Sequence, residues 1–271
     1  METLNPTIEL WIRLGLFLAI FISVAVWEIM APRRKLLIPK ARRWASNLGL
    51  LILNSLVVRF LFPFAAVGFA VIARDNQWGL FNQIELPLII SIVACVIIFD
   101  CLIYWQHRIM HMMPILWRLH RVHHADLDYD LTTGSRFHPI EIILSMLIKG
   151  LAIFLLGPPV LAVLIFEVLL NGMAMFNHAN ASLPSRVDRI VRRWLVTPDM
   201  HRVHHSINTH ETNSNYGFNL SIWDRIFSSY IKQPEAGHDD MTIGVGDYRD
   251  PGQVNRLPGM LMIPFTRART K

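Results

Sequence analysis

Long apolar runs restrict the fold of this chain more than any other feature. They lie at about 10–31, 48–73 and 85–106, and a further stretch at 140–177 is interrupted by Gly157-Pro158-Pro159. A helix needs about 20 apolar residues to cross the hydrocarbon core of a bilayer. The sequence therefore predicts an all-α integral membrane protein with about four transmembrane helices. The last stretch is expected to form two short antiparallel helices, which cross fully or dip in as a re-entrant hairpin.

Composition and charge agree with a membrane location. The 271 residues are 53% hydrophobic and carry a formal net charge of +6, and the mean hydropathy is +0.37. This is too apolar for an ordinary soluble domain. No basic module with interleaved aromatic residues is present, so the charge predicts anchoring to anionic lipid rather than nucleic-acid binding.

Basic residues in the short loops predict the orientation of the chain. One cluster lies between the first two apolar runs and a second follows the 140–177 stretch. Their members are Arg33, Arg34, Lys35, Lys40, Arg42 and Arg43, and then Arg186, Arg189, Arg192 and Arg193. Because basic loops face the cytoplasm, both clusters are expected there, with the third span ending on the same side. A bacterial inner membrane fits this compact architecture, and an endoplasmic reticulum membrane is the eukaryotic alternative.

The chain is expected to divide into three parts. Residues 1–84 would hold the N-terminal transmembrane helices, and residues 85–230 the catalytic domain. Within that domain, a cytoplasmic histidine-rich helical cap would be built from about 107–138 and 178–230. Residues 231–271 are rich in Pro, Gly and polar residues and predict a loosely ordered basic tail.

Eight of the 12 histidines fall into three tight groups. His107 and His111 form the first group, and the sequence His-Arg-Val-His-His occurs at 120–124 and again at 201–205. On a helix, residues three and four apart share a face, so each His-x-x-His-His set is expected to aim its imidazoles at one point. One zinc ion takes about four ligands, so eight convergent imidazoles indicate two metals. Imidazole alone does not identify the metal.

The four other histidines receive different interpretations. His178 ends the last apolar stretch on the cytoplasmic side and is predicted to be a ligand. His138 could equally be a ligand, a hydrogen-bond partner of a ligand or a structural anchor. His210 and His238 lie in polar segments and are expected to be solvated.

Three further residues are candidates for binding the metal or for holding its ligands. Asp100 and Tyr104 precede His107 by seven and three residues, so both lie near the histidine face of one helix. A carboxylate there can accept the second N–H of a metal-bound imidazole; the alternative is that Asp100 only caps a buried polar pocket. Asn180, close to His178, is the third candidate.

These motifs resemble the fatty acid hydroxylase/sterol desaturase superfamily of membrane di-iron oxidases, in particular compact bacterial-type members and the core of alkylglycerol monooxygenase. The resemblance runs from about 90 to 230. It rests on the histidine order His107, His111, His120, His123, His124, His178, His201, His204, His205 and on the flanking segments 104–108, 135–139, 197–206, 215–217 and 223–227.

The resemblance implies a di-iron centre that uses O₂ to hydroxylate or desaturate a lipid, such as a fatty acyl chain, an ether lipid or a sterol-like molecule. Some members carry a histidine where this chain has Ala174, which leaves nine matched positions. One metal would then keep a water molecule as a ligand, or His138 would supply the further ligand. Residues 1–271 include no cytochrome b5-like domain, so electrons are expected from a separate cytochrome b5-like protein, ferredoxin or reductase.

The lipid is expected to rise between the third span and the 140–177 hairpin. Met110, Met112, Met113, Met173 and Met175 lie near the histidines and could line such a groove, although methionine at helical spacing is more often core packing.

Three rival functions are weaker. A zinc hydrolase would need H-E-x-x-H or a glutamate beside a histidine pair, and neither is present. A membrane metal-binding or metal-transport protein would place histidines along the spans rather than on one side of them. A degenerate family member would have lost part of the intact clusters.

Overall fold

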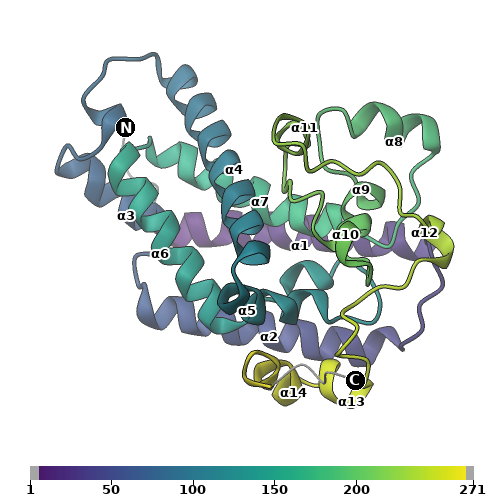
Figure 1. Cartoon of the computed structure of the whole chain (residues 1–271). Coiled ribbons are helices and arrows are strands. Elements are labelled where there is room, and N and C mark those ends of the chain that lie inside the picture. The colour runs from purple at the N-terminus through teal and green to yellow at the C-terminus, as the bar shows by residue number, and fades with distance from the viewer. Residues whose placement is uncertain (1–5, 267–271) are drawn as a thin grey trace.

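The computed structural model describes residues 6–266, and their regular elements are helices. Long helices form the body of the molecule (Figure 1). They are α1 (Pro6–Met30), α2 (Lys40–Leu61), α3 (Ala65–Asp75), α4 (Leu88–Met112), α6 (Pro139–Leu156) and α7 (Val160–Asn177). Among the described residues, the β-type pairings are isolated bridges such as that between Pro32 and Ala181. The predicted all-α class is therefore confirmed.

Five helical segments are long and apolar enough to cross a bilayer. They are Leu10–Met30, Lys40–Asp75, Leu88–Met112, Pro139–Leu156 and Val160–Asn177. Large apolar side chains such as Leu18, Leu56 and Leu151 stand exposed on their outer faces, as lipid contact requires. The chain is an integral membrane protein.

The second apolar run differs from its predicted bounds. The helix begins at Lys40 instead of about 48, and it breaks after Leu61 before resuming at Ala65. Pro63 lies in the break, and proline both lacks an N–H donor and clashes with the preceding turn. The apolar pattern continues across this break, which is why hydropathy alone does not reveal it.

The predicted hairpin is present as α6 and α7, two helices of 18 residues each. Gly157 ends α6 in the left-handed conformation, with φ of 60°, which glycine adopts without a side-chain penalty. A Cβ atom at this position would lie 2.3 Å from the carbonyl oxygen of Trp78. The turn is therefore fixed by backbone geometry and by close packing.

Short elements gather in the centre, on the right and at the bottom of Figure 1. They contain most of the residues after Asn177. Their bounds are α5 (Pro114–His124), η2 (Thr133–Ser135), α8 (Ser185–Val191), α9 (Pro198–His204), α10 (Thr209–Thr212), α11 (Ile222–Ile226), α12 (Gly237–Asp240), α13 (Pro251–Val254), α14 (Leu257–Met262) and η3 (Ile263–Phe265), while η1 (Leu80–Asn82) lies apart. We call the region formed by 113–138 and 178–266 the cap.

A buried ion network joins α2 to the cap. Arg43 is fully buried, and its guanidinium donates to both carboxylate oxygens of Asp126 at 2.9 and 2.7 Å and also to Asp130. The two arginines Arg43 and Arg136 hold the pKa of Asp126 well below its usual range despite burial. As a member of the basic cluster after the first apolar run, Arg43 is expected to contact anionic lipid. It pairs with buried carboxylates instead. Hydropathy and loop charge carry no information about such pairing.

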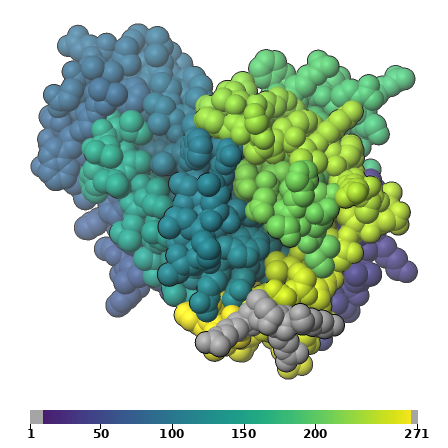
Figure 2. Space-filling view, viewed as in Figure 1, coloured from purple at the N-terminus to yellow at the C-terminus, as the bar shows by residue number. Residues whose placement is uncertain are grey.

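The prediction of a loosely ordered C-terminal tail is wrong for residues 231–266. Tyr248, Val254, Met260 and Ile263 pack in one buried cluster with Val122 of α5 and residues of α2. Two arginines of α5, Arg118 and Arg121, donate to backbone carbonyls of residues 263, 264 and 266. Apolar residues spaced among Pro and Gly thus fold onto α2 and α5, and Figure 2 shows the yellow C-terminal segment at the bottom of the molecule. The last basic residues of the tail, Arg267, Arg269 and Lys271, lie outside the described residues.

Candidate metal centre

A sharp turn at the end of α4 brings the first two histidine groups together. Met113 is extended, with φ of −95° and ψ of 117°, and Pro114 occupies the first turn of α5. A residue before proline is pushed out of the helical region, so α4 stops and α5 folds back against it. The turn brings the rings of His111 and His120 to a centroid distance of 5.0 Å.

The second His-x-x-His-His set lies on a helix with a clear local start signal. Thr197 caps α9 by accepting a hydrogen bond from the N–H of Met200 at 3.3 Å, and Pro198 occupies the first turn. Threonine followed by proline is a favourable helix start. The threonine hydroxyl accepts from a backbone N–H that has no partner within the helix, and proline has no N–H that would need one. This fixes His201 and His204 on the short helix and His205 at its C-terminal cap.

Nine histidines converge into two groups, and the ligand nitrogens within each group lie within 4.8 Å of one another. The first group, which we call the five-histidine group, contains His107, His111, His120, His124 and His204. The second, the four-histidine group, contains His123, His178, His201 and His205. All nine predicted ligand positions are thus brought together, and no other histidine belongs to either group among residues 6–266.

The expectation that each His-x-x-His-His set aims at one point is wrong. From α5, His120 and His124 join the five-histidine group and His123 joins the other. From α9, His201 and His205 join the four-histidine group and His204 joins the other. Around a helix, the last histidine of each set lies about 40° from the first. The middle histidine, three residues after the first, lies about 60° from it in the opposite direction. Each helix therefore contributes a pair to one group and a single imidazole to the other.

In the five-histidine group, three histidines form a hydrogen bond at Nδ1, which leaves Nε2 available to bind a metal. The Nδ1 atoms of His107 and His204 lie 2.8 and 2.7 Å from the carbonyl oxygens of Tyr216 and Ser214. Nδ1 of His120 lies 2.7 Å from a carboxylate oxygen of Glu141. The Nε2 atoms of these three histidines are buried and have no protein partner. An acceptor at Nδ1 selects the tautomer that presents a lone pair at Nε2, which is the form that binds a metal.

The four-histidine group shows the same arrangement around His178. Its Nδ1 lies 2.7 Å from the carbonyl oxygen of Ala174, and its Nε2 lies 3.2 Å from Nε2 of His123 and 3.1 Å from Nε2 of His201. Two nitrogens bound to one metal at about 2.0–2.2 Å are separated by roughly 3 Å. The donor set therefore fits a metal ion at each group.

Burial holds the imidazoles in the neutral state that metal binding needs. It lowers the pKa of His178 to about 4 and, together with neighbouring histidines, that of His204 to about 3. The pKa values of His123, His124, His201 and His205 also lie well below the usual range because these rings are buried and face one another.

The remaining predicted positions lie outside both groups. His138 caps α6 by accepting from the N–H of Ile140, and its Nε2 lies 3.3 Å from the carbonyl oxygen of Leu261, so it serves as a structural anchor. His210 is exposed, as predicted. His238 is buried, which contradicts the predicted solvated side chain, because α12 packs it 3.7 Å from Asp199.

Asp100, Tyr104 and Asn180 do not bond to a histidine and instead connect other segments around the site. Asp100 accepts from Trp223 Nε1 at 2.8 Å and from the backbone N–H groups of residues 219 and 220. Asp100 thus does not bond to a histidine itself. It fixes the segment next to Tyr216, and the carbonyl oxygen of Tyr216 accepts from His107. Tyr104 bonds to Ser229, and Asn180 bonds to the backbone of Arg34.

Sequence reasoning missed two residues of the site. Glu141 is the carboxylate that holds His120, at 2.7 Å, and its place in the segment after His138-Pro139 was the available signal. Gly134 packs so closely that a Cβ atom would lie 2.7 Å from the carbonyl oxygen of Ala174 and 3.1 Å from Nδ1 of His178. No sequence signal distinguishes this glycine.

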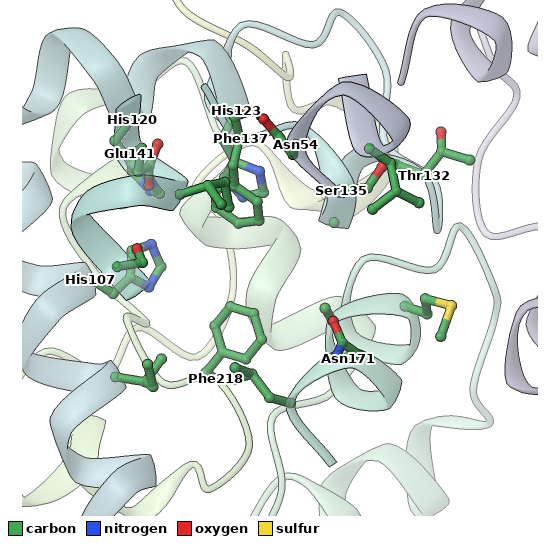
Figure 3. A pocket seen from close by; sticks show the side chains of 18 of the residues that line it. Asn54, His107, His120, His123, Thr132, Ser135, Phe137, Glu141, Asn171 and Phe218 are labelled. Atoms are coloured by element: carbon green, nitrogen blue, oxygen red, sulfur yellow. Dashed lines mark hydrogen bonds and ion pairs between the residues drawn. The ribbon is translucent and has the colours of Figure 1, made fainter. Parts of the chain in front are cut away.

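A cavity of about 250 Å³ lies beside the histidines and extends between the membrane helices (Figure 3). His107, His120 and His123 form part of its wall, and Asn171 and Phe218 face the same space. Most of the lining is apolar and comes from α1, α2, α4, α6 and α7, including Met110, Met146 and Met175. Met110 and Met175 therefore line the cavity as expected, whereas Met112 and Met113 are exposed at the surface.

Comparisons with known proteins agree with this arrangement. The sequence model of the family described as fatty acid hydroxylase matches residues 92–229, which include all nine grouped histidines. Ornithine lipid hydroxylase of Rhizobium tropici is 28% identical over 168 residues, covering 62% of this chain and 47% of that protein. Alkylglycerol monooxygenase of Xenopus tropicalis is 34% identical over 133 residues, covering 49% and 28%. Lathosterol oxidase of Homo sapiens is 28% identical over 162 residues, covering 60% and 50%.

The similarity spans half or less of the length of each of these relatives. No solved structure matches the chain significantly.

Proposed function

Because this chain belongs to the fatty acid hydroxylase family, we propose that it is a membrane-bound non-haem di-iron oxidoreductase. It would use O₂ and external electrons to hydroxylate or desaturate a lipid. One observation carries the proposal: two groups of neutral imidazoles lie against a mostly apolar cavity between membrane helices. The relatives named as a hydroxylase of ornithine lipid, an alkylglycerol monooxygenase and a lathosterol oxidase support a lipid as the substrate.

The proposed ligands are the nine grouped histidines. His107, His111, His120, His124 and His204 would hold one iron, and His123, His178, His201 and His205 the other. The four-histidine group thus offers one imidazole fewer than the five-histidine group. Neither His138 nor Asp100 is proposed as a ligand, because each is engaged with a backbone group outside the two groups.

Two irons bound here would supply the reductive activation of O₂ that breaks an unactivated C–H bond. In hydroxylation one oxygen atom enters the lipid and the other leaves as water, with two electrons and two protons taken from the donor. In desaturation the lipid loses two hydrogen atoms, the donor again supplies two electrons together with two protons, and both oxygen atoms leave as water.

The contribution of the protein is positioning and exclusion of water. Glu141, Tyr216 and Ser214 orient three imidazoles through Nδ1, and the apolar wall of the cavity would align the acyl chain or ring of the substrate beside His107, His120 and His123.

The site is proposed to face the cytoplasm of a bacterial inner membrane. Arg33 of the basic loop after α1 contacts Asp199 of α9 at 3.4 Å, so this loop and the histidine cap lie on one side, and basic loops face the cytoplasm. That side would also receive the separate electron donor, whether a cytochrome b5-like protein, a ferredoxin or a reductase.

A metal-transport function has less support. The nine histidines lie together, in the C-terminal parts of α4 and α5, just after α7 and at the end of α9, whereas a permeation path needs polar groups stepping through the spans.

Metal analysis of protein purified without oxygen tests the proposal. We expect about two irons per chain and a di-iron signature in Mössbauer spectra. Retention of a single zinc, with no iron bound after anaerobic reconstitution, would reject it. The His210→Ala variant, which removes an exposed histidine, serves as a control that keeps its metal.

The substrate is tested by lipid profiling of cells with and without the gene. A hydroxylated or desaturated lipid should appear only when the protein and O₂ are both present. An unchanged lipid profile in a strain whose protein carries iron and which supplies a competent electron donor would argue against lipid oxidation.

A further inference from the structure

The ring of Phe137 lies flat against the imidazole of His123. The two ring centroids are 4.6 Å apart and the ring planes differ by only 9°. Aromatic rings stacked at such a distance attract each other beyond the effect of burial alone. Because His123 belongs to the four-histidine group, Phe137 directly contacts a proposed metal ligand.

His123 lacks the hydrogen bond that orients several of the other ligands. Its Nε2 lies 3.2 Å from Nε2 of His178, whereas its Nδ1 is buried and has no protein partner among residues 6–266. Nδ1 of His178, in contrast, lies at the carbonyl oxygen of Ala174. The torsion that turns an imidazole about its Cβ–Cγ bond is soft, and a hydrogen bond at the second nitrogen normally restricts it. For His123, the flat contact with Phe137 restricts this rotation instead.

The backbone around Phe137 is fixed on both sides. Asn54 of α2 donates from Nδ2 to the carbonyl oxygen of Phe137 at 2.8 Å. The preceding residue, Arg136, is fully buried and donates to the carbonyl oxygen of Val254 at 3.0 Å. The following residue, His138, caps α6. The position of the ring relative to His123 is therefore set by its side-chain packing on a backbone that cannot shift.

Phe137 also forms part of the cavity wall. Phe137 and His123 both line the cavity, together with apolar side chains such as Met110, Met146 and Leu170. Figure 3 shows Phe137 and His123 at the same wall. One face of the Phe137 ring covers the imidazole, so a hydrocarbon chain in the cavity would pack against the rest of the ring. The same side chain would then contact a lipid and a metal ligand.

We propose that Phe137 is a positioning residue that couples lipid binding in the cavity to metal binding at the four-histidine group. A hydrocarbon packed on Phe137 holds the ring over His123 and restricts the imidazole to the orientation that binds metal. Because coupling between two sites is reciprocal, each ligand strengthens binding of the other. That the metal is iron and the lipid is the substrate rests on the function proposed above, whereas the coupling applies to any divalent metal that the group binds.

Metal binding tests the positioning role without requiring activity. Cobalt(II) is the probe, because imidazole sites bind it and its optical spectrum reports its ligands. We titrate the full chain in neutral detergent. Phe137→Leu, which keeps an apolar side chain but removes the flat ring, should bind one of the two cobalt ions about two- to tenfold more weakly, as expected for loss of a stacked pair. Phe137→Tyr, which keeps the ring, should restore the affinity.

Two further variants localise the effect. Phe17→Leu is the matched control, because it removes another phenylalanine of the cavity wall, whose ring stacks on Phe21, and it should leave cobalt affinity unchanged. His205→Ala is expected to lose the metal of the four-histidine group, so adding Phe137→Leu should not weaken binding of the remaining cobalt. If Phe137 only stabilised the fold, its loss would weaken the remaining cobalt as well.

Hexadecanol, a neutral lipid, tests the coupling. At saturating hexadecanol the wild-type chain should bind cobalt at the four-histidine group more tightly, by up to about tenfold, since the effect cannot exceed the energy of the stacked pair. This gain should disappear in Phe137→Leu and return in Phe137→Tyr.

Three results would overturn the inference: cobalt affinity that Phe137→Leu does not change, a wild-type affinity that hexadecanol does not change, or an equal gain in Phe137→Leu. Coupling in a chain that binds cobalt but takes up no iron would preserve the role of Phe137 while rejecting the oxidase.

Discussion

At the residue scale, the Nδ1 atoms of four imidazoles explain how this site is prepared for metal. Nδ1 of His107, His178 and His204 lies at a backbone carbonyl, and Nδ1 of His120 lies at the side-chain carboxylate of Glu141. A backbone acceptor cannot be removed by substitution, whereas the carboxylate can. Glu141 is therefore the residue at which this orienting effect can be tested directly.

We predict that Glu141→Ala lowers metal affinity about 10- to 100-fold, as expected when the partner of a ligating histidine is lost. Glu141→Gln should lose less, because an amide oxygen still accepts from Nδ1. Metal content after dialysis against a graded chelator measures the effect, with Glu235→Ala, an exposed acidic residue, as the control. Unchanged metal retention in Glu141→Ala would show that His120 does not depend on this hydrogen bond.

His238 should make folding stability depend on pH. Burial lowers its pKa to about 4, with Arg202, Arg33 and Arg192 acting in the same direction and Asp199 opposing them. The unfolded residue has a pKa of about 6.5, so below that pH the unfolded chain binds a proton that the folded chain refuses. Stability from this residue is complete above about 6.5 and is lost as the pH falls toward 4.

The corresponding measurement compares thermal unfolding of the wild-type chain and His238→Gln between pH 4 and pH 7. The variant should lose less stability on acidification, and the difference should not exceed about 3 kcal/mol. The His210→Gln control should follow the wild-type curve. Identical curves for the wild type and His238→Gln would mean that the pKa of His238 is the same in the folded and the unfolded protein.

At the element scale, most helices follow from local sequence, but the division of the histidines does not. Proline at the start of α5, α6 and α9 and the threonine cap of α9 mark helix starts. The Gly-Pro-Pro interruption at 157–159 marks the turn between α6 and α7. The split of each His-x-x-His-His set depends on how α5 and α9 face each other across the site, which spacing within one helix cannot indicate.

This division predicts selective metal loss. His205→Ala leaves three histidines in the four-histidine group, while His124→Ala leaves four in the other. We therefore expect His205→Ala to retain about one metal per chain. His124→Ala should still bind two metals per chain, with weaker affinity at the five-histidine group. Metal-to-protein ratios measured by elemental analysis decide this. Equal loss of both metals in either variant would indicate that the two groups do not bind independently.

At the scale of the whole molecule, buried ion pairs and a folded C-terminal segment hold the cap against the membrane helices. Arg43 connects α2 to Asp126 and Asp130, and arginines of α5 hold the carbonyls of residues 263–266. Parts far apart in the sequence thus close around the histidines. The positions of these contacts are determined by packing, not by any local pattern.

We predict that Arg43→Met destabilises the folded protein by about 3–5 kcal/mol, because it leaves two buried carboxylates without their partner. Arg42→Met, a change at the adjacent exposed arginine, should have little effect. Unfolding of both variants in the same detergent measures the difference. Similar stability of the two variants would show that the network contributes little to holding α2.

The sequence by itself determined the membrane class, the helical fold, the family and the nine histidines that converge. These follow from apolar length, from residue spacing and from motifs that are local along the chain. Only the tertiary structure decided which histidine joins which group, that Glu141 rather than Asp100 contacts a histidine, that His238 is buried and that residues 231–266 pack against α2 and α5. Each of these depends on the relative orientation of distant segments, and such orientation is set by long-range packing and buried charge pairing, which no local pattern encodes.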